Sequence, residues 1–237
     1  MNLSKRSLLP ALFVLTLSLA ALAQTSTHST AEPESTFNVG GTSIVIPSPD
    51  GSMVEAGGDR PILENFTPQS NRLIAVFVKR SDMPLHEMSA DHELTLYGMV
   101  QVLRRAEFMD IDENGFKEVT ASAKESLGGN LASFSDKADA ELAERLKNLD
   151  VELNVTVGKP VIIGTFLSQK NAYAFGMIVP VKKDGETIKM ITGCTLMRVK
   201  NRLIYLYVYV RYQNEESVHQ MHRMLLGWTR AILAENQ

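Results

Sequence analysis

One segment of the chain imitates a calcium-binding loop. Asp110, Asp112 and Asn114 place oxygen ligands at the first, third and fifth positions, and a glycine takes the sixth. The twelfth position, where such a loop requires a bidentate glutamate, is Ala121. A helix start explains the same residues, because Asp112 or Asn114 can cap a helix whose first apolar residue is Phe116. We therefore interpret the segment as a helix cap rather than as a calcium site.

Four histidines form two pairs with the chemistry of metal ligands. His86 and His92 occupy one polar loop, and His219 and His222 lie three residues apart in a predicted C-terminal helix. Imidazole nitrogens suit zinc or copper. Solvated histidines are the commoner outcome, so we expect neither pair to hold a metal, and we expect no cofactor. His222 should flank the apolar face of its helix, and His219 should face water.

The remaining catalytic chemistry is sparse. Cys194 is the one cysteine, which excludes a disulfide within the chain, and its apolar neighbours predict an inert, buried thiol. The sequence contains no nucleophile elbow, P-loop, dinucleotide-binding or zinc-protease motif. We therefore favour a protein that is not an enzyme. The alternative is a hydrolase or metal-dependent enzyme whose residues are dispersed over loops 47–70 and 81–92, because catalytic groups need not be adjacent in sequence.

Composition and charge narrow the class of protein. The 237 residues are 44% hydrophobic and 22% charged, which is typical of a globular protein and too polar for a multi-span membrane protein. With 24 basic and 27 acidic residues the formal net charge is −3. No basic excess is present to neutralise phosphates, so we expect no nucleic-acid partner.

The N-terminal segment has the features of a secretory signal peptide. Two basic residues precede an apolar run over residues 8–22, and the small-residue cleavage site ends at Ala23. We therefore predict cleavage after Ala23, a secreted or periplasmic location, and no membrane span after cleavage. The polar residues 24–41 predict a disordered linker. A single domain should follow over residues 42–237.

The hydrophobic pattern of this domain separates strands from helices. Short turns between the later strands require antiparallel pairing, and this segregation favours an α+β fold over a doubly wound parallel one. We expect a twisted, mainly antiparallel sheet of about six to seven strands, with helices on both faces and a long C-terminal helix. Strands are predicted over 42–46, 72–79, 94–103, 151–157, 161–167, 172–181, 187–199 and 202–212, and helices over 113–127, 137–149 and 214–235.

The strand 202–212 has two apolar faces and should therefore be central. Tyr205, Tyr207 and Tyr209 alternate with the aliphatic residues Ile204, Leu206, Val208 and Val210. Residues Val218, Met221, Leu225, Trp228 and Ile232 form an apolar stripe on the last helix, which should cover the aliphatic face. We expect the helices 113–127 and 137–149 to cover the tyrosines, although an aromatic platform for a ligand is the alternative.

Two features resemble the PsbP-like superfamily, which includes the photosystem II extrinsic P subunit and the periplasmic DcrB proteins. They are the N-terminal motif Gly41-x-x-Ile44-x-Ile46-Pro47-x-Pro49-x-Gly51 and the strand 202–212 running directly into the last helix. The resemblance implies a twisted antiparallel sheet between helices, and a small binding or assembly-accessory protein without an active site. We therefore expect a secreted or periplasmic, non-enzymatic protein that binds an envelope protein or a small ligand.

Overall fold

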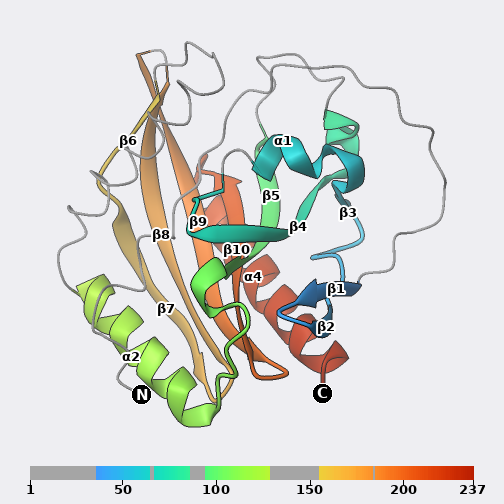
Figure 1. Ribbon diagram of the computed structural model, residues 1–237. Helices are drawn as coiled ribbons and strands as arrows, with labels where there is room; N and C mark the ends of the chain where they lie inside the picture. Colours follow the sequence, from blue (N-terminus) through green and yellow to red (C-terminus); the bar gives the residue numbers. More distant parts are fainter. Residues whose placement is uncertain (1–35, 65–66, 86–93, 129–154, 184) are drawn as a thin grey trace.

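A computed structural model describes residues 36–64, 67–85, 94–128, 155–183 and 185–237, and it has an α+β fold (Figure 1). Eight strands form one sheet in the order β3-β4-β5-β10-β9-β8-β6, with β7 also paired to β8. Every pairing in this sheet is antiparallel. The strands are β3 (Met53–Glu55), β4 (Asn71–Lys79), β5 (Leu96–Leu103), β6 (Val155–Val157), β7 (Val161–Gln169), β8 (Ala172–Lys183), β9 (Glu186–Val199) and β10 (Arg202–Arg211). The predicted fold class is confirmed.

The described α-helices are the short α1 (Arg60–Glu64), α2 (Glu113–Gly128) and α4 (Glu215–Glu235), and single 3-10 turns occur at Gly57–Asp59, Arg80–Asp82 and Arg104–Ala106. Helix α4 begins at a capping box, in which Asn214 Oδ1 accepts from the N–H of Glu216 and Ser217 Oγ accepts from the N–H of Asn214. These contacts satisfy backbone donors that the first turn leaves without helical partners. Among the described helices, none is both long and apolar enough to cross a membrane.

Strand β10 is buried on both faces, as its sequence predicts. Tyr205, Tyr207 and Tyr209 belong to one apolar cluster, which also contains the buried residues of α2. The aliphatic side chains of β10 belong to a second cluster, together with the apolar stripe of α4. The sheet therefore separates two cores, and α4 covers one of them.

The face of the sheet beneath α4 contains a row of glycines. Val208 of β10 lies opposite Gly98 on β5 and opposite Gly193 on β9, and Gly193 lies opposite Gly176 on β8. The three glycines thus line up across neighbouring strands, interrupted by Val208 alone. We call Gly98, Gly176 and Gly193 the glycine row.

Large side chains fill the space above the glycine row. A Cβ atom added to Gly98 would lie 2.6 Å from Trp228 Cζ3, and one added to Gly193 would lie 2.3 Å from Met221 Sδ. A Cβ on the third glycine would lie 2.5 Å from the ring of Phe166. Such distances are shorter than van der Waals contact, so the absence of Cβ atoms is what lets α4 approach the backbone of the sheet.

Trp228 is the central residue of this interface. Its side chain is fully buried, and its Nε1–H donates to the backbone oxygen of Pro47 at 2.7 Å. Its ring packs edge-on against Phe77, with the ring centres 5.3 Å apart. His219, on the opposite side of the helix, is exposed. The predicted orientation of α4 is confirmed.

The folded chain begins earlier than predicted. Residues 36–41 were assigned to the linker, but β1 (Thr36–Val39) pairs with β2 (Thr42–Val45) as an antiparallel hairpin. Gly40 and Gly41 form its turn with φ of 55° and 83°, the left-handed conformations that a two-residue hairpin turn requires. Val39 is fully buried and the half-buried Phe37 packs against the same core, so these two apolar residues fix a strand whose other residues are polar.

Other predicted segments differ from the structure or lie outside its described residues. The predicted loop 47–70 contains β3 and α1, and β3 raises the sheet to eight strands because its short backbone pairs with the end of β4. The predicted signal peptide, the linker up to residue 35 and the predicted helix 137–149 lie outside the described residues. Of the predicted strand 151–157, the structure describes only residues 155–157, which form β6.

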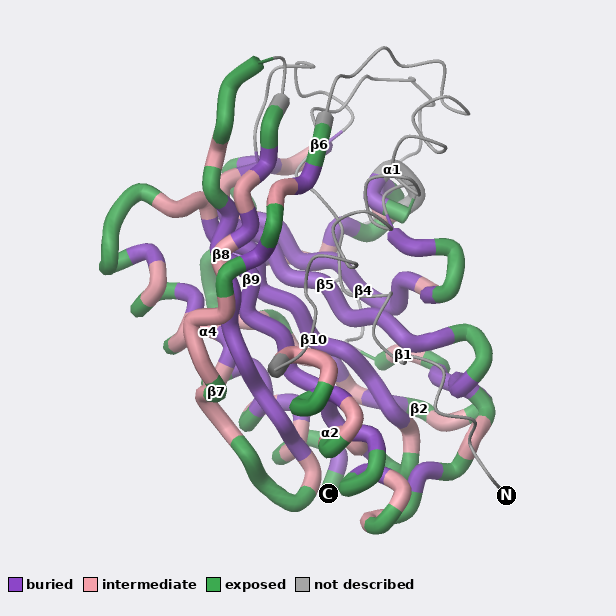
Figure 2. Tube along the Cα trace, turned by 90° about the vertical axis from the view of Figure 1, so that its left-hand side faces the viewer, coloured by how far each residue is buried: buried purple, intermediate pink, exposed green. Residues whose placement is uncertain are grey.

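Strand β7 forms an outer edge of the sheet. It faces the viewer in Figure 2, where its intermediate and exposed residues contrast with the buried strands behind it. The strand carries no charged residue. Its register shifts between Ile162 and Gly164 and again between Thr165 and Leu167. Bulges of this kind interrupt the regular edge that another strand would need for pairing.

Candidate functional site

The β1–β2 hairpin meets two segments that are far from it in sequence. The N–H of Ile111 donates to the backbone oxygen of Asn201 at 2.8 Å, and Lys200 Nζ donates to the backbone oxygen of Ser43 at 3.0 Å. These contacts join the end of the β9–β10 hairpin to both other segments. We call residues 38–43, 107–111 and 198–202 the hairpin corner.

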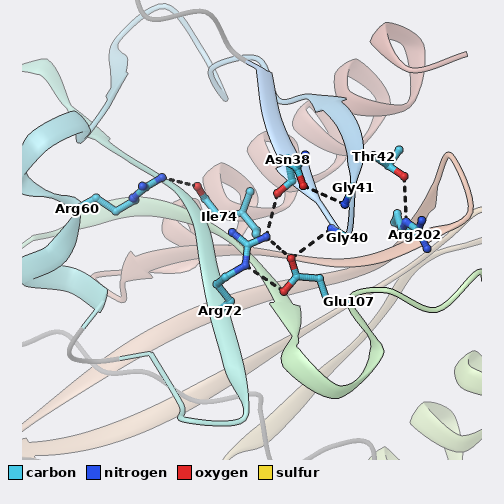
Figure 3. Close-up of polar contacts among 9 residues, drawn as sticks. All are labelled: Asn38, Gly40, Gly41, Thr42, Arg60, Arg72, Ile74, Glu107 and Arg202. Atoms are coloured by element: carbon cyan, nitrogen blue, oxygen red, sulfur yellow. Dashed lines mark hydrogen bonds and ion pairs between the residues drawn. The ribbon is translucent and has the colours of Figure 1, made fainter.

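Arg72 and Glu107 hold the hairpin in place (Figure 3). The guanidinium binds the carboxylate through two nitrogens, with Nε 3.0 Å from Oε2 and Nη2 in contact with Oε1. Arg72 Nη2 also donates to the backbone oxygen of Asn38, and the N–H of Gly40 donates to Glu107 Oε1 at 3.2 Å. The hydrogen bond from Arg72 lowers the pKa of Glu107, so this buried carboxylate stays ionised.

Backbone contacts tighten the same junction. A Cβ atom at Gly40 would lie 2.0 Å from the backbone oxygen of Glu107. No other residue fits there, because Gly40 also has a positive φ. The hairpin turn therefore rests directly on the loop that follows β5.

The residue after Glu107 is Phe108, whose side chain is 76% exposed. The loop that carries it is bonded on both sides, because Glu107 binds Arg72 and Ile111 binds Asn201. Within it the N–H of Met109 donates to the backbone oxygen of Ala106 at 3.1 Å. An aromatic side chain in water on a fixed loop is the arrangement of a binding anchor. Phe108 was not among the residues singled out from the sequence, since the exposure of one apolar residue in a loop cannot be read from its neighbours.

The calcium-like segment is a helix cap, as we predicted. Asp112 Oδ1 accepts from the N–H of Gly115 at 2.7 Å at the start of α2. Asp110 Oδ1 instead lies 3.1 Å from Arg202 Nη1, and Asn114 is exposed on the first turn of the helix. The three oxygen-bearing side chains thus have different environments. Within the described residues, no group of three or more histidines, cysteines or carboxylates is placed to hold a metal ion.

The structure describes one of the two histidine pairs. His86 and His92 lie outside the described residues. His219 is exposed, whereas His222 is half-buried, with its ring centre 4.6 Å from that of Phe166 on β7. His222 therefore flanks the apolar stripe of α4, as expected from its spacing.

In the described parts of loops 47–70 and 81–92, polar side chains bind nearby backbone. Ser48 Oγ donates to the backbone oxygens of Asp50 and Met53, and Asp59 Oδ2 accepts from the N–H of Leu85 at 2.8 Å. The contacts of Ser48 stabilise a turn, and the contact of Asp59 joins the two loops. They do not bring together an acid, a base and a nucleophile among the residues described, so the structure adds no support to the enzymatic alternative.

The buried tyrosines and the thiol belong to the core. Tyr205, Tyr207 and Tyr209 are each at most 3% exposed, and Tyr97 stacks on Tyr209 with the ring centres 4.5 Å apart. Cys194 is fully buried, and burial raises the pKa of its thiol well above the ordinary value. The predicted burial of both features is confirmed, and the tyrosines present no open platform.

Comparisons with known proteins add little to this geometry. No protein-family model matches the chain, and no curated protein matches it in sequence. A solved structure of a mutant of the protein Mog1 is similar over 83% of this chain and 88% of its own, with 15% sequence identity and a TM-score of 0.34. A likeness of this degree carries no argument about fold or function. The α+β class rests on the strand pairing itself.

Proposed function

We propose that this chain is an exported, non-enzymatic protein that binds another protein of the cell envelope through the hairpin corner. The observation that carries the proposal is the exposure of Phe108 on a loop bonded at both ends. Export is proposed from the signal-like residues 1–23.

Phe108 gains more from contact with a partner than it contributes to the fold. A side chain left three-quarters in water contributes little to the core, and burying it against a partner gains about 1.5–3 kcal/mol. The ion pair of Glu107 with Arg72 and the hydrogen bond from Ile111 to Asn201 already order the loop. Binding therefore costs little further conformational entropy, which favours affinity.

A photo-crosslinking residue in place of Ser43 tests the docking site. Ser43 is exposed, belongs to the hairpin corner and is independent of the anchor itself. We expect a discrete adduct in intact cells that falls at least about 30-fold in Phe108→Ala, the effect of losing about 2 kcal/mol at a hot spot.

Val161→Ala is the matched control, because Val161 is the other large apolar side chain that is exposed among the described residues. It should leave the adduct unchanged. The proposal fails if no adduct forms, or if Phe108→Ala and Val161→Ala have the same effect.

Export is tested separately by N-terminal sequencing of the protein from the soluble envelope fraction. The mature chain should begin at or within a few residues of Gln24. An intact N-terminus at Met1 in that fraction would contradict a cleaved signal.

A further inference from the structure

We infer that the partner surface that receives Phe108 is acidic, with aspartate or glutamate side chains around an apolar pocket. This inference rests on the proposed docking at the hairpin corner and adds the chemistry of the partner. It follows from the way charges are paired around Phe108.

The acidic side chains nearest to Phe108 in sequence already have internal partners. Glu107 binds Arg72 through both carboxylate oxygens, and Asp110 pairs with Arg202. Asp112 accepts from the N–H of Gly115 as a helix cap. Each of these carboxylates therefore serves the fold.

The cations of the hairpin corner are bonded differently. Arg198 donates to the amide oxygens of Asn171 and Asn201, at 2.8–3.1 Å, and Lys200 donates to the backbone oxygen of Ser43. These acceptors are neutral, so they fix the positions of the two cations without cancelling their charge. Two hydrogen-bonded cations are thus held at the end of the β9–β10 hairpin.

A third cation precedes Phe108 in the chain. Arg104 is exposed and begins the helical turn Arg104–Ala106, which leads directly into Glu107 and Phe108. In the part of the chain that the structure describes, neither Arg104, Arg198 nor Lys200 forms an ion pair with a carboxylate.

The sign of this surface is opposite to that of the whole chain, whose formal net charge is −3. Cations that form no ion pair, beside an exposed aromatic residue, attract an acidic surface and disfavour a basic one. An acidic protein surface with an apolar pocket matches both features of the corner. A bilayer with anionic lipids is the competing occupant, and the experiment below separates the two.

The test uses the crosslinking residue at Ser43 with the double variant Arg104→Gln/Lys200→Gln. The matched control is Lys182→Gln/Lys189→Gln, which removes the same charge at exposed positions on β8 and β9. We expect the corner variant to lower the adduct yield about tenfold at low salt and the control to leave it unchanged. Raising the salt to about 0.5 M should weaken the wild-type adduct, because the screening length becomes shorter than the separation of rim charges.

The outcomes distinguish the docking site at the hairpin corner from the acidic character of its partner. An adduct that depends on Phe108 but not on Arg104 and Lys200 would refute the acidic partner and leave the docking site standing. Loss of the adduct in both double variants would also refute it, because the effect would then follow net charge. If vesicles of 30% phosphatidylglycerol in phosphatidylcholine bind the purified chain, and Phe108→Ala abolishes that binding, the occupant is a membrane instead.

Discussion

Replacing Gly98 by alanine adds a single methyl group at the point where the sheet meets Trp228. The new Cβ would lie 2.6 Å from Cζ3 and 2.9 Å from Cη2 of the indole, where ordinary contact begins at 3.4 Å. The indole has little room to retreat, because its Nε1–H is bonded to Pro47 and its ring packs on Phe77. Overpacking a core in this way costs about 1–3 kcal/mol, and the rigid neighbour favours the upper half of that range.

Gly227→Ala is the same chemical change with the opposite expected sign. Gly227 is exposed in the interior of α4, and a Cβ there meets nothing within 4 Å. Alanine should therefore gain about 0.5–1 kcal/mol from helix propensity. Urea unfolding followed by far-ultraviolet circular dichroism measures both variants. With a slope of about 2 kcal/mol/M, Gly98→Ala should lower the midpoint by about 1 M and Gly227→Ala should raise it by a few tenths.

A double-mutant cycle links the cost at Gly98 to the indole itself. Trp228→Phe removes the distal ring that the new methyl group strikes, so Gly98→Ala should cost less in that background. The reasoning would be refuted if Gly98→Ala were as stable as the wild type, or if the two substitutions were additive. It would also fail if both alanine variants shifted the midpoint in the same direction.

Three other results are expected. Trp228→Ala should lower the free energy of unfolding by about 3–5 kcal/mol, while the exposed His219→Ala should change it by no more than about 0.5 kcal/mol in the same urea assay. Because Arg72 lowers the pKa of Glu107, this carboxylate adds stability above the ordinary carboxyl pKa and loses it as the pH falls through the lowered value. Glu107→Gln should therefore flatten the acid side of a plot of unfolding free energy against pH. An unchanged slope would contradict a stabilising ion pair between Arg72 and Glu107. Cys194 should react slowly with a thiol reagent in the native protein and rapidly in urea, so fast native labelling would contradict its burial.

The strands and helices with strong periodicity were predictable from the sequence. In β10, tyrosines and aliphatic residues alternate strictly, and this pattern favours a strand buried on both faces, which the two core clusters confirm. The stripe on α4 defined the orientation of Trp228 for the same reason. In both elements the local pattern and the tertiary environment agree.

Features that depend on register or on weak local signals were not predictable in the same way. Gly98, Gly176 and Gly193 are isolated glycines in the sequence, and only strand pairing aligns them beneath α4. Strand β1 was missed because only two apolar residues, Phe37 and Val39, fix a short segment that follows a polar stretch, although the Gly-Gly turn was a usable signal. Exposure of Phe108 depends on backbone bonds to distant segments, which no local pattern encodes.

The bonds between the first hairpin and the last helix determine when the protein can fold during its synthesis. Asn236 pairs with both backbone groups of Val45, and Trp228 binds Pro47, across 191 and 181 residues of chain. A ribosome releases the hairpin before the helix, so α4 cannot cover the aliphatic face of the sheet until residues 215–235 have been synthesised. Contacts of such long range also make folding slow. For an exported chain, as proposed above, slow folding lengthens the time in which the polypeptide is unfolded and can be translocated.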